Sequence, residues 1–249
     1  MKRAYWEKMA PSYNEEIFDV LQQDRKALIK KEIKKHADPT HKVIDIGCAI
    51  GKWFPVLSPQ FKKVVALDIS AENLRIAKEM YPGFGNIDYC RGDMSNPRIK
   101  LPRCEMGICI NAILTPEAKD RIIFFRNLSR CIKKEGILII TVPSLESFLL
   151  SKIIQQEFSI DASLFPTLKN KKKGLQNWNK ILRGVGDIDQ VPHKHFLGEE
   201  LELLLERSGF QTIKRQKIEY NWNTEFHKPP RWLQSPRPWD WMIVVRKIK

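Results

Sequence analysis

Val43-Ile-Asp-Ile-Gly-Cys-Ala-Ile-Gly51 predicts a short apolar strand that runs into a tight turn bounded by two glycines. Because glycine has no Cβ, Gly47 and Gly51 allow the backbone to turn sharply and to come within contact distance of a ligand. Asp45 stands near the end of the strand, where its carboxylate is placed to bind a ligand ammonium directly or through water. Alone, the pattern is equally typical of an ordinary strand-to-helix turn.

Further short apolar segments follow, separated by longer amphipathic ones, and this alternation is typical of a mainly parallel α/β sheet. The first five predicted strands are short, β-branched and nearly free of polar residues, as expected where helices cover both faces of a sheet. They span Val43 to Ile46, Val64 to Leu67, Ile87 to Arg91, Gly107 to Ile110 and Ile137 to Val142, and two further strand-like segments span Thr212 to Trp222 and Trp241 to Ile248.

Helices are predicted between these strands from apolar residues at helical spacing and from capping residues. The expected helices span Glu15 to Lys35, Ser70 to the Pro82-Gly83 stop, Thr115 to Lys134, Phe148 to Phe158 and Gly198 to Arg207. Residues 143–192 contain no second strand-helix repeat, so we interpret them as an insertion. The proline-rich segment Lys228 to Pro238 is expected to run extended over the surface.

Acidic residues follow the second and third predicted strands. Asp68 ends the second strand, where its carboxylate can accept both hydroxyls of a ribose. Arg91-Gly92-Asp93-Met94 follows the third. Since open α/β sheets bind ligands at the carboxyl ends of their strands, we expect Gly47, Asp68 and Asp93 to converge on one nucleoside.

The composition restricts the class of protein and its partners. Lysine and arginine number 43 against 29 acidic residues, for a net charge of +14, which favours polyanions or acidic substrates as partners. The five cysteines form no CxxC pair and are expected to be buried free thiols, and no metal site is predicted. No secretory signal or membrane-spanning stretch is evident, so a cytoplasmic protein is expected.

With these motifs, the chain resembles the class I S-adenosylmethionine-dependent methyltransferases, in particular the small-molecule enzymes related to ubiquinone and menaquinone biosynthesis methyltransferases. The resemblance covers nearly the whole chain. It implies that the cofactor is bound by the first motif, by the second and third strand ends, by the residues after the fourth strand and by an N-terminal tyrosine. These residues are Asp45, Gly47, Cys48, Ala49 and Gly51, then Asp68 and Ile69, then Gly92, Asp93 and Met94, then Asn111 and Ala112, and finally Tyr13.

The resemblance also implies a Rossmann-like seven-stranded sheet of order 3-2-1-4-5-7-6 that ends in an antiparallel hairpin. Residues 1–249 are expected to form a single domain, with residues 1–40 as an N-terminal helical cover and residues 143–192 as a cap over the acceptor pocket. Ala49 replaces the middle glycine of the first motif, which requires a negative φ at that position. The fourth strand ends in Ile110-Asn111 and lacks the loop of amino-methylating nucleic-acid enzymes.

Four residues are candidates for the acceptor side of the site. If the acceptor is a hydroxyl or a carbon acid, His195 is the first candidate for a general base, since the ordinary pKa of histidine lies near neutrality; alternatively, it caps or packs against the following helix. Trp6 and Tyr13 either contact substrate and cofactor or anchor a helical lid. Trp222 belongs to a group with Trp232, Trp239 and Trp241 that forms either a substrate wall or the packing of the last hairpin.

The prediction for function is methyl transfer from S-adenosylmethionine to a small molecule. One alternative is an RNA methyltransferase, which the net charge and the basic run Lys169 to Lys173 would serve. Another is a methyltransferase-like module without activity that binds nucleic acid or a protein. A dehydrogenase is less consistent with Ala49 and the terminal hairpin.

Overall fold

The computed structural model describes residues 3–13, 17–161, 178–188 and 191–249, and its centre is a seven-stranded sheet. The strand order β3-β2-β1-β4-β5-β9-β8 confirms the predicted 3-2-1-4-5-7-6, because β8 and β9 are the sixth and seventh strands of this sheet. The first five strands are parallel, and β9 is antiparallel to both of its neighbours. The strands are β1 Lys42–Ile46, β2 Lys63–Asp68, β3 Ile87–Arg91, β4 Cys104–Ile110, β5 Ile132–Pro143, β8 Phe210–Glu219 and β9 Trp239–Lys247.

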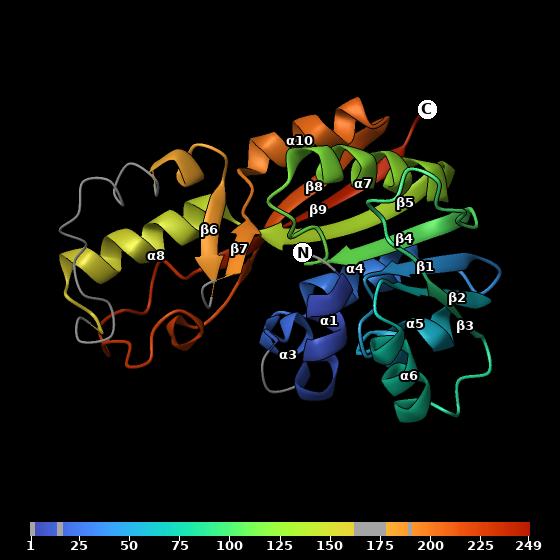
Figure 1. The fold of residues 1–249 in the computed structure, drawn as a ribbon, viewed down its shortest axis with the longest axis horizontal. Coiled ribbons are helices and arrows are strands. Elements are labelled where there is room, and N and C mark those ends of the chain that lie inside the picture. Colours follow the sequence, from blue (N-terminus) through green and yellow to red (C-terminus); the bar gives the residue numbers. More distant parts are fainter. Residues whose placement is uncertain (1–2, 14–16, 162–177, 189–190) are drawn as a thin grey trace.

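Helices cover both faces of the sheet (Figure 1). On one face, α7 Ala118–Cys131 and α10 Gly198–Arg207 pack on the strands through Phe125, Leu128 and Leu201. On the other, the helices α4 Leu28–His36, α5 Phe54–Leu57 and α6 Ala71–Met80 complete a second buried cluster. The three-layer α/β arrangement therefore has an apolar layer on each side of the sheet.

Start signals in the sequence predicted α6 well. Ser70 caps this helix, since its side chain accepts a hydrogen bond from the backbone N–H of Asn73. Helix α8, Leu145–Glu157, begins three residues before the expected Phe148, because Ser144 caps it in the same way through Ser147. Helix α7 begins after Glu117 rather than at Thr115.

The prediction of one helix from Glu15 to Lys35 is wrong. The N-terminal part consists of α1 Arg3–Met9, a 3-10 turn Ala10–Ser12, α3 Val20–Gln23 and α4. Within the described residues, the chain breaks between α3 and α4, where Ala27 adopts a positive φ of 51°. Helix α4 then starts separately, since the Asp24 carboxylate accepts a hydrogen bond from the Ile29 N–H.

Residues from the insertion lie beside the carboxyl end of the main sheet (Figure 1). Helix α8 is accompanied by a two-stranded sheet that the sequence did not predict, β6 Val185–Ile188 paired with β7 Val191–Lys194. Trp222, Phe226 and Leu233 form a separate apolar cluster with α8. The expected basic run Lys169 to Lys173 lies outside the described residues.

The segment Lys228 to Pro238 is not extended as predicted. It forms turns, such as the hydrogen bond from the Leu233 N–H to the Pro230 carbonyl, and Leu233 is buried. The preceding strand β8 ends at Glu219, and Trp222 lies in a 3-10 turn rather than in the strand. Burial of Leu233 and Trp222 in the cluster beside α8 accounts for both differences.

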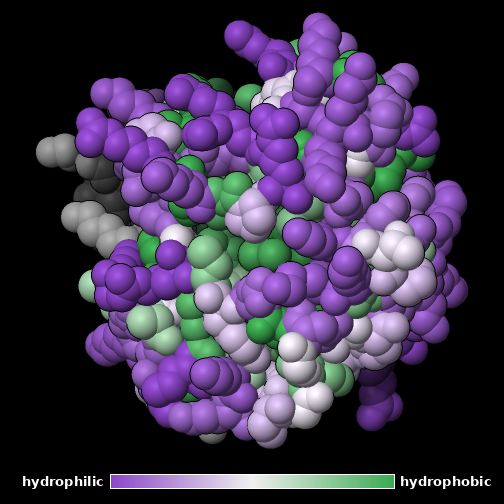
Figure 2. Space-filling view, turned by 90° about the vertical axis from the view of Figure 1, so that its right-hand side faces the viewer, coloured by the Kyte–Doolittle hydropathy of each residue, from purple (hydrophilic) through white to green (hydrophobic). Residues whose placement is uncertain are grey.

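Polar side chains dominate one face of the molecule (Figure 2). Figure 2 shows the face on the right of Figure 1, where hydrophilic side chains surround a small hydrophobic area. All five cysteines are free; four are buried and Cys90 is half-buried, which largely confirms the expectation of buried thiols. None of the described helices has the length and apolar character needed to cross a membrane.

Candidate active site

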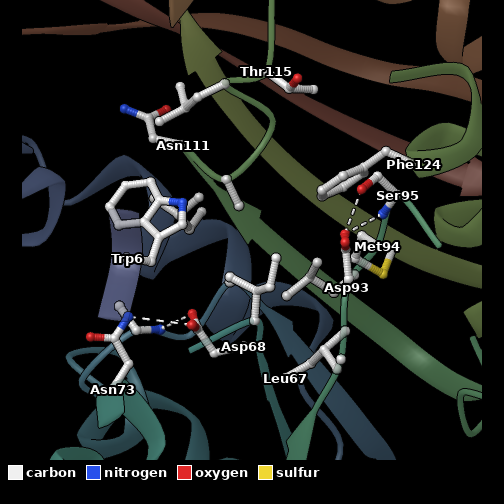
Figure 3. A pocket seen from close by; sticks show the side chains of 18 of the residues that line it. Trp6, Leu67, Asp68, Asn73, Asp93, Met94, Ser95, Asn111, Thr115 and Phe124 are labelled. Carbon is white, nitrogen blue, oxygen red and sulfur yellow. Dashed lines mark hydrogen bonds between the residues drawn. The ribbon is translucent and has the colours of Figure 1, made fainter. Parts of the chain in front are cut away.

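A cavity lies at the carboxyl ends of strands β1 to β4 (Figure 3). Its volume, including the open mouth, is about 830 Å³, which is within the range of small-molecule and cofactor sites. Gly47, Asp68 and Asp93 all line it, so the three strand ends meet at one cavity. The cavity is also lined by Trp6, Tyr13, Ala49, Ile69, Gly92, Met94, Asn111 and Ala112 from the predicted site.

In the loop after β1, every second residue from position 47 to position 51 has a positive φ. Gly47, Ala49 and Gly51 have φ values of 74°, 47° and 82°. A Cβ on Gly47 would lie 2.5 Å from the Cβ of Ala112, so only glycine fits between the loop and the end of β4. The expectation of a negative φ at Ala49 is wrong. Its N–H donates to Asp68 Oδ2 at 2.9 Å, which helps to hold this residue in the left-handed region.

Asp68 is the last residue of β2, and its carboxylate holds the backbone around this strand end. Its carboxylate accepts hydrogen bonds from the backbone N–H groups of Ala49 and Ser70, at 2.9 and 2.8 Å, and from Asn73 Nδ2 at 3.3 Å. Burial raises the pKa of Asp68, and these hydrogen bonds to the charged form oppose the rise. The side chain therefore joins the glycine loop to the start of α6 while it lines the cavity.

Asp93 turns the chain after β3 towards the same cavity (Figure 3). Its Oδ1 accepts hydrogen bonds from the N–H and the hydroxyl of Ser95, at 2.8 and 2.6 Å. A Cβ at Gly92 would lie 2.7 Å from Ile99 Cδ1, so a larger residue there would require the Ile99 side chain to shift. Met94 is buried beside this turn, and Phe124 of α7 lines the same end of the cavity.

Asn111 lies at the end of β4 with a positive φ of 47° and with its carboxamide fixed on both sides. Its Nδ2 donates to Asp240 Oδ2 at 2.6 Å, and its Oδ1 accepts from the Thr141 hydroxyl at 3.0 Å. The Tyr220 hydroxyl also donates to Asp240 Oδ2, at 2.8 Å. Burial raises the pKa of Asp240 to about 7. Thr141 of β5 and Asp240 of β9 thereby position a residue that lines the cavity.

Five residues of the predicted site do not line the cavity, namely Asp45, Cys48, Gly51, His195 and Trp222. Cys48 and Gly51 belong to the loop that encloses it. Asp45 is buried beneath the loop, and its Oδ2 has no hydrogen-bond partner among the described residues. Burial, and secondly the charge of Asp68, raises the pKa of Asp45 to about 8.

His195 and Trp222 pack within the part of the molecule that contains α8. The His195 ring lies 4.6 Å from that of Phe148, its Nδ1 is 3.2 Å from the His193 carbonyl, and burial lowers its pKa to about 4. Trp222 stacks on Phe226 at 5.2 Å and donates to the Pro236 carbonyl. For both residues this geometry favours the packing role over direct contact with a substrate.

Several lining residues were missed by sequence reasoning. Asn73, Asp120 and Phe124 come from helices. In a helix pattern, apolar residues indicate packing and polar residues indicate solvent exposure, so neither kind points to a ligand. Ser95 follows the motif Gly92-Asp93-Met94 directly and was the one that the strand-end pattern could have included.

The fold and part of the sequence match known proteins. Residues 43–136 match the family model described as "Methyltransferase domain". A methyltransferase dependent on S-adenosylmethionine from Methanosarcina mazei is 17% identical, with 87% of this chain and 97% of that chain covered and a TM-score of 0.64. One from Anabaena variabilis is 14% identical over 98% and 94%, with a TM-score of 0.65.

The N-methyltransferase NodS from Bradyrhizobium japonicum, crystallised with S-adenosyl-L-homocysteine, is 10% identical over 99% of this chain and 98% of that one, with a TM-score of 0.64. No curated protein matches the sequence. The chain thus carries a methyltransferase domain on the fold of the class I methyltransferases that depend on S-adenosylmethionine.

Proposed function

We propose that this protein is an S-adenosylmethionine-dependent methyltransferase that passes the methyl group to a small molecule bound between the N-terminal helix α1 and helix α8. In this proposal residues 1–249 act as one domain, with residues 1–40 as a cover and residues 143–192 as a cap. Helices α1 and α8 flank the carboxyl end of the sheet, where the cavity opens (Figure 1). An acceptor bound there would lie next to the cofactor, and no second protein would be needed to complete the site.

Two features of the cavity fit the cofactor. Gly47 lies so close to Ala112 that no side chain fits at position 47. The bare backbone of the loop can therefore contact a ligand directly. Beneath the same loop, the unpartnered Oδ2 of Asp45 is a buried acceptor that a nearby ammonium would stabilise. We assign the ribose hydroxyls to Asp68, the adenine amino group to Asp93 with Met94 against the ring, and the methionine part to Asn111 and Ala112.

The bound cofactor supplies an activated methyl group, so the protein's main task is alignment of the reacting atoms. Asp68 and Asp93 fix the nucleoside end, and Asn111, held by Asp240 and Thr141, fixes the opposite end. Trp6 lines the open side and reduces the access of water. This scheme requires no general base.

The charges around the cavity favour a neutral or cationic small acceptor over RNA. Asp120 is the acidic lining residue that the cofactor assignment leaves for the acceptor, and no lysine or arginine lines the cavity among the residues that the structure describes. A site for RNA requires basic groups that neutralise phosphates. The net charge of +14 motivates the RNA alternative, but it is carried by other surfaces of the protein.

The cofactor assignment is tested by calorimetric titration with S-adenosylmethionine. We expect binding in the micromolar range that Asp68→Ala abolishes, since the ribose contacts and the loop contacts are lost together. Asp88→Ala is the matched control, because Asp88 is an exposed acid on the neighbouring strand β3, paired with Lys63. Binding that survives in Asp68→Ala, or that is lost equally in both variants, would contradict the assignment.

The acceptor class is tested by transfer of labelled methyl groups in a mixture of metabolites and total RNA. We expect the label in the fraction that passes an ultrafiltration membrane. Label in RNA, or an affinity for RNA that falls steeply with salt, would support the alternative acceptor instead.

We propose that His195 has a packing role and does not act as the general base that the sequence suggested. Its variant His195→Ala is expected to keep full turnover, because a neutral, packed imidazole outside the cavity lining has no access to the acceptor. A loss of turnover with unchanged thermal stability would restore the catalytic role.

A further inference from the structure

Helix α1 is attached to the rest of the molecule by an acidic side chain. The Glu7 carboxylate accepts hydrogen bonds from the Ser70 hydroxyl at 2.8 Å and from the N–H groups of Ala71 and Glu72 at 3.0 Å each. Arg3, one turn earlier on α1, donates to the same carboxylate at 3.1 Å. Helix α1 has no fully buried residue, and its half-buried side chains Tyr5, Trp6 and Met9 supply only partial apolar packing.

The contact occupies the amino end of α6. The first N–H groups of a helix have no partner within the helix, and the helix dipole favours a negative charge there. A carboxylate from a distant segment satisfies both requirements. Its hydrogen bonds, of which the one from the Glu72 N–H is the strongest cause, lower the pKa of Glu7 to about 2, so the contact persists at neutral pH.

The same end of α6 is part of the cavity wall. Ser70 donates its N–H to Asp68 and its hydroxyl to Glu7, and thus lies between the cavity acid and the helix α1. Trp6, the residue before Glu7, lines the cavity with its indole above Asp68 (Figure 3). Opening α1 would therefore break the Glu7 contacts and move Trp6 away from Asp68.

We propose that Glu7 is a positioning residue that fastens α1 to the amino end of α6 and so holds Trp6 across the mouth of the cavity. Binding and release of the cofactor then require the Glu7 contacts to open. This inference rests on the proposed cofactor site, but the fastening itself is a property of the free protein.

The first test needs no ligand. Hydrogen exchange is measured for the amides of Ala71 and Glu72 and for those of residues 3–9 in the free protein. Glu7→Ala is expected to raise exchange at these amides by about fivefold, the ratio expected when a capping interaction is lost. Glu7→Gln is expected to have a smaller effect in the same direction, since its amide oxygen keeps part of the contact.

Glu79→Gln is the control, because it removes an acidic charge from the exposed end of the same helix, where Glu79 pairs with Arg75. Unchanged exchange in Glu7→Ala, or equal changes in Glu7→Ala and Glu79→Gln, would overturn the proposal.

The second test measures the release of S-adenosylhomocysteine by stopped flow. Glu7→Ala is expected to release it about fivefold faster than the unsubstituted protein. An unchanged release rate together with faster exchange would show that α1 does not gate the cavity and would overturn the proposal. If the unsubstituted protein fails to bind S-adenosylhomocysteine, the proposed cofactor site fails, whereas the exchange result still decides the fastening.

Discussion

Ala49 holds the cavity loop in a conformation that glycine adopts at lower cost. The left-handed region is strained by about 1–2 kcal/mol for a residue with a Cβ. Ala49 is kept there at φ 47° between two glycines that also have positive φ. Compared with glycine, alanine reduces the conformational entropy of the unfolded chain, which favours folding, but it is strained in the folded loop.

We expect Ala49→Gly to raise the free energy of unfolding by about 0.5–1 kcal/mol, since relief of the strain outweighs the added freedom of the unfolded chain. Urea unfolding measures the change. Ala77→Gly in the middle of α6 is the control and should lower stability. Equal losses in the two variants would contradict the strained geometry at Ala49.

Asp45 makes stability depend on pH. Its pKa is about 8 in the folded protein, well above the ordinary value of 3.8, so between about pH 4 and pH 8 the native state binds a proton that the unfolded state has lost. The free energy of unfolding therefore falls as the pH rises through this window. Asp45→Asn removes this contribution and should gain stability relative to the unsubstituted protein by up to about 1.4 kcal/mol per pH unit.

Urea unfolding near both ends of this window tests the prediction. Asp240, whose pKa is also raised by burial, is present in both proteins and cancels from the comparison. A stability difference between the two proteins that stays constant across the window would show that Asp45 is ionised throughout.

At the scale of residues, the sequence predicted the groups that end strands and missed those that come from helices. Asp68 and Asp93 were predictable because a parallel sheet brings its carboxyl ends to one edge. Asn73 and Phe124 were not, because their orientation depends on how α6 and α7 dock on the sheet. The positive φ of Ala49 depends on a hydrogen bond to Asp68 that sequence spacing does not reveal.

At the scale of elements, Glu146 joins three of them at the start of the cap segment. Its carboxylate accepts hydrogen bonds from the Ser144 hydroxyl in front of α8, from Trp241 Nε1 on β9 and from the Gly198 N–H at the start of α10, at 2.9, 2.9 and 3.1 Å. These contacts fix the angle at which α8 leaves the sheet.

We expect Glu146→Ala to lower the free energy of unfolding by about 2 kcal/mol, because hydrogen bonds to a charged group are lost and buried donors are left without partners. Glu157→Ala, at the exposed far end of α8, is the control and should change stability by less than about 0.5 kcal/mol. Urea unfolding of the two variants measures these changes. Similar losses of stability in both would contradict the role of Glu146 in joining the three elements.

Local sequence signals succeeded for elements with their own caps and failed where a break depends on distant contacts. Ser70 predicted the start of α6 because the cap lies within the helix sequence. The break between α3 and α4 was hidden, because the residues on both sides of Ala27 suit a helix and the buried face of α4 was read as continuous. The pair β6 and β7 was missed because a glycine and a proline interrupt the strand pattern.

At the scale of the whole molecule, strand-helix alternation predicted a mainly parallel α/β sheet, and the resemblance to the methyltransferases supplied the strand order that the structure confirms. The net charge of +14 had suggested an acidic partner, but it gave no information about the cavity, whose described lining has acidic and no basic side chains. Net charge describes long-range attraction, whereas a site is defined by the few groups that converge on it.

The account depends on a single nucleoside site formed by three strand ends, and a crystal structure with S-adenosylhomocysteine tests it most directly. We predict the ribose on Asp68, the adenine beside Asp93 and Met94, and the glycine loop at Gly47 in contact with the ligand. A ligand bound elsewhere, or contacts to only one of these strand ends, would contradict the account.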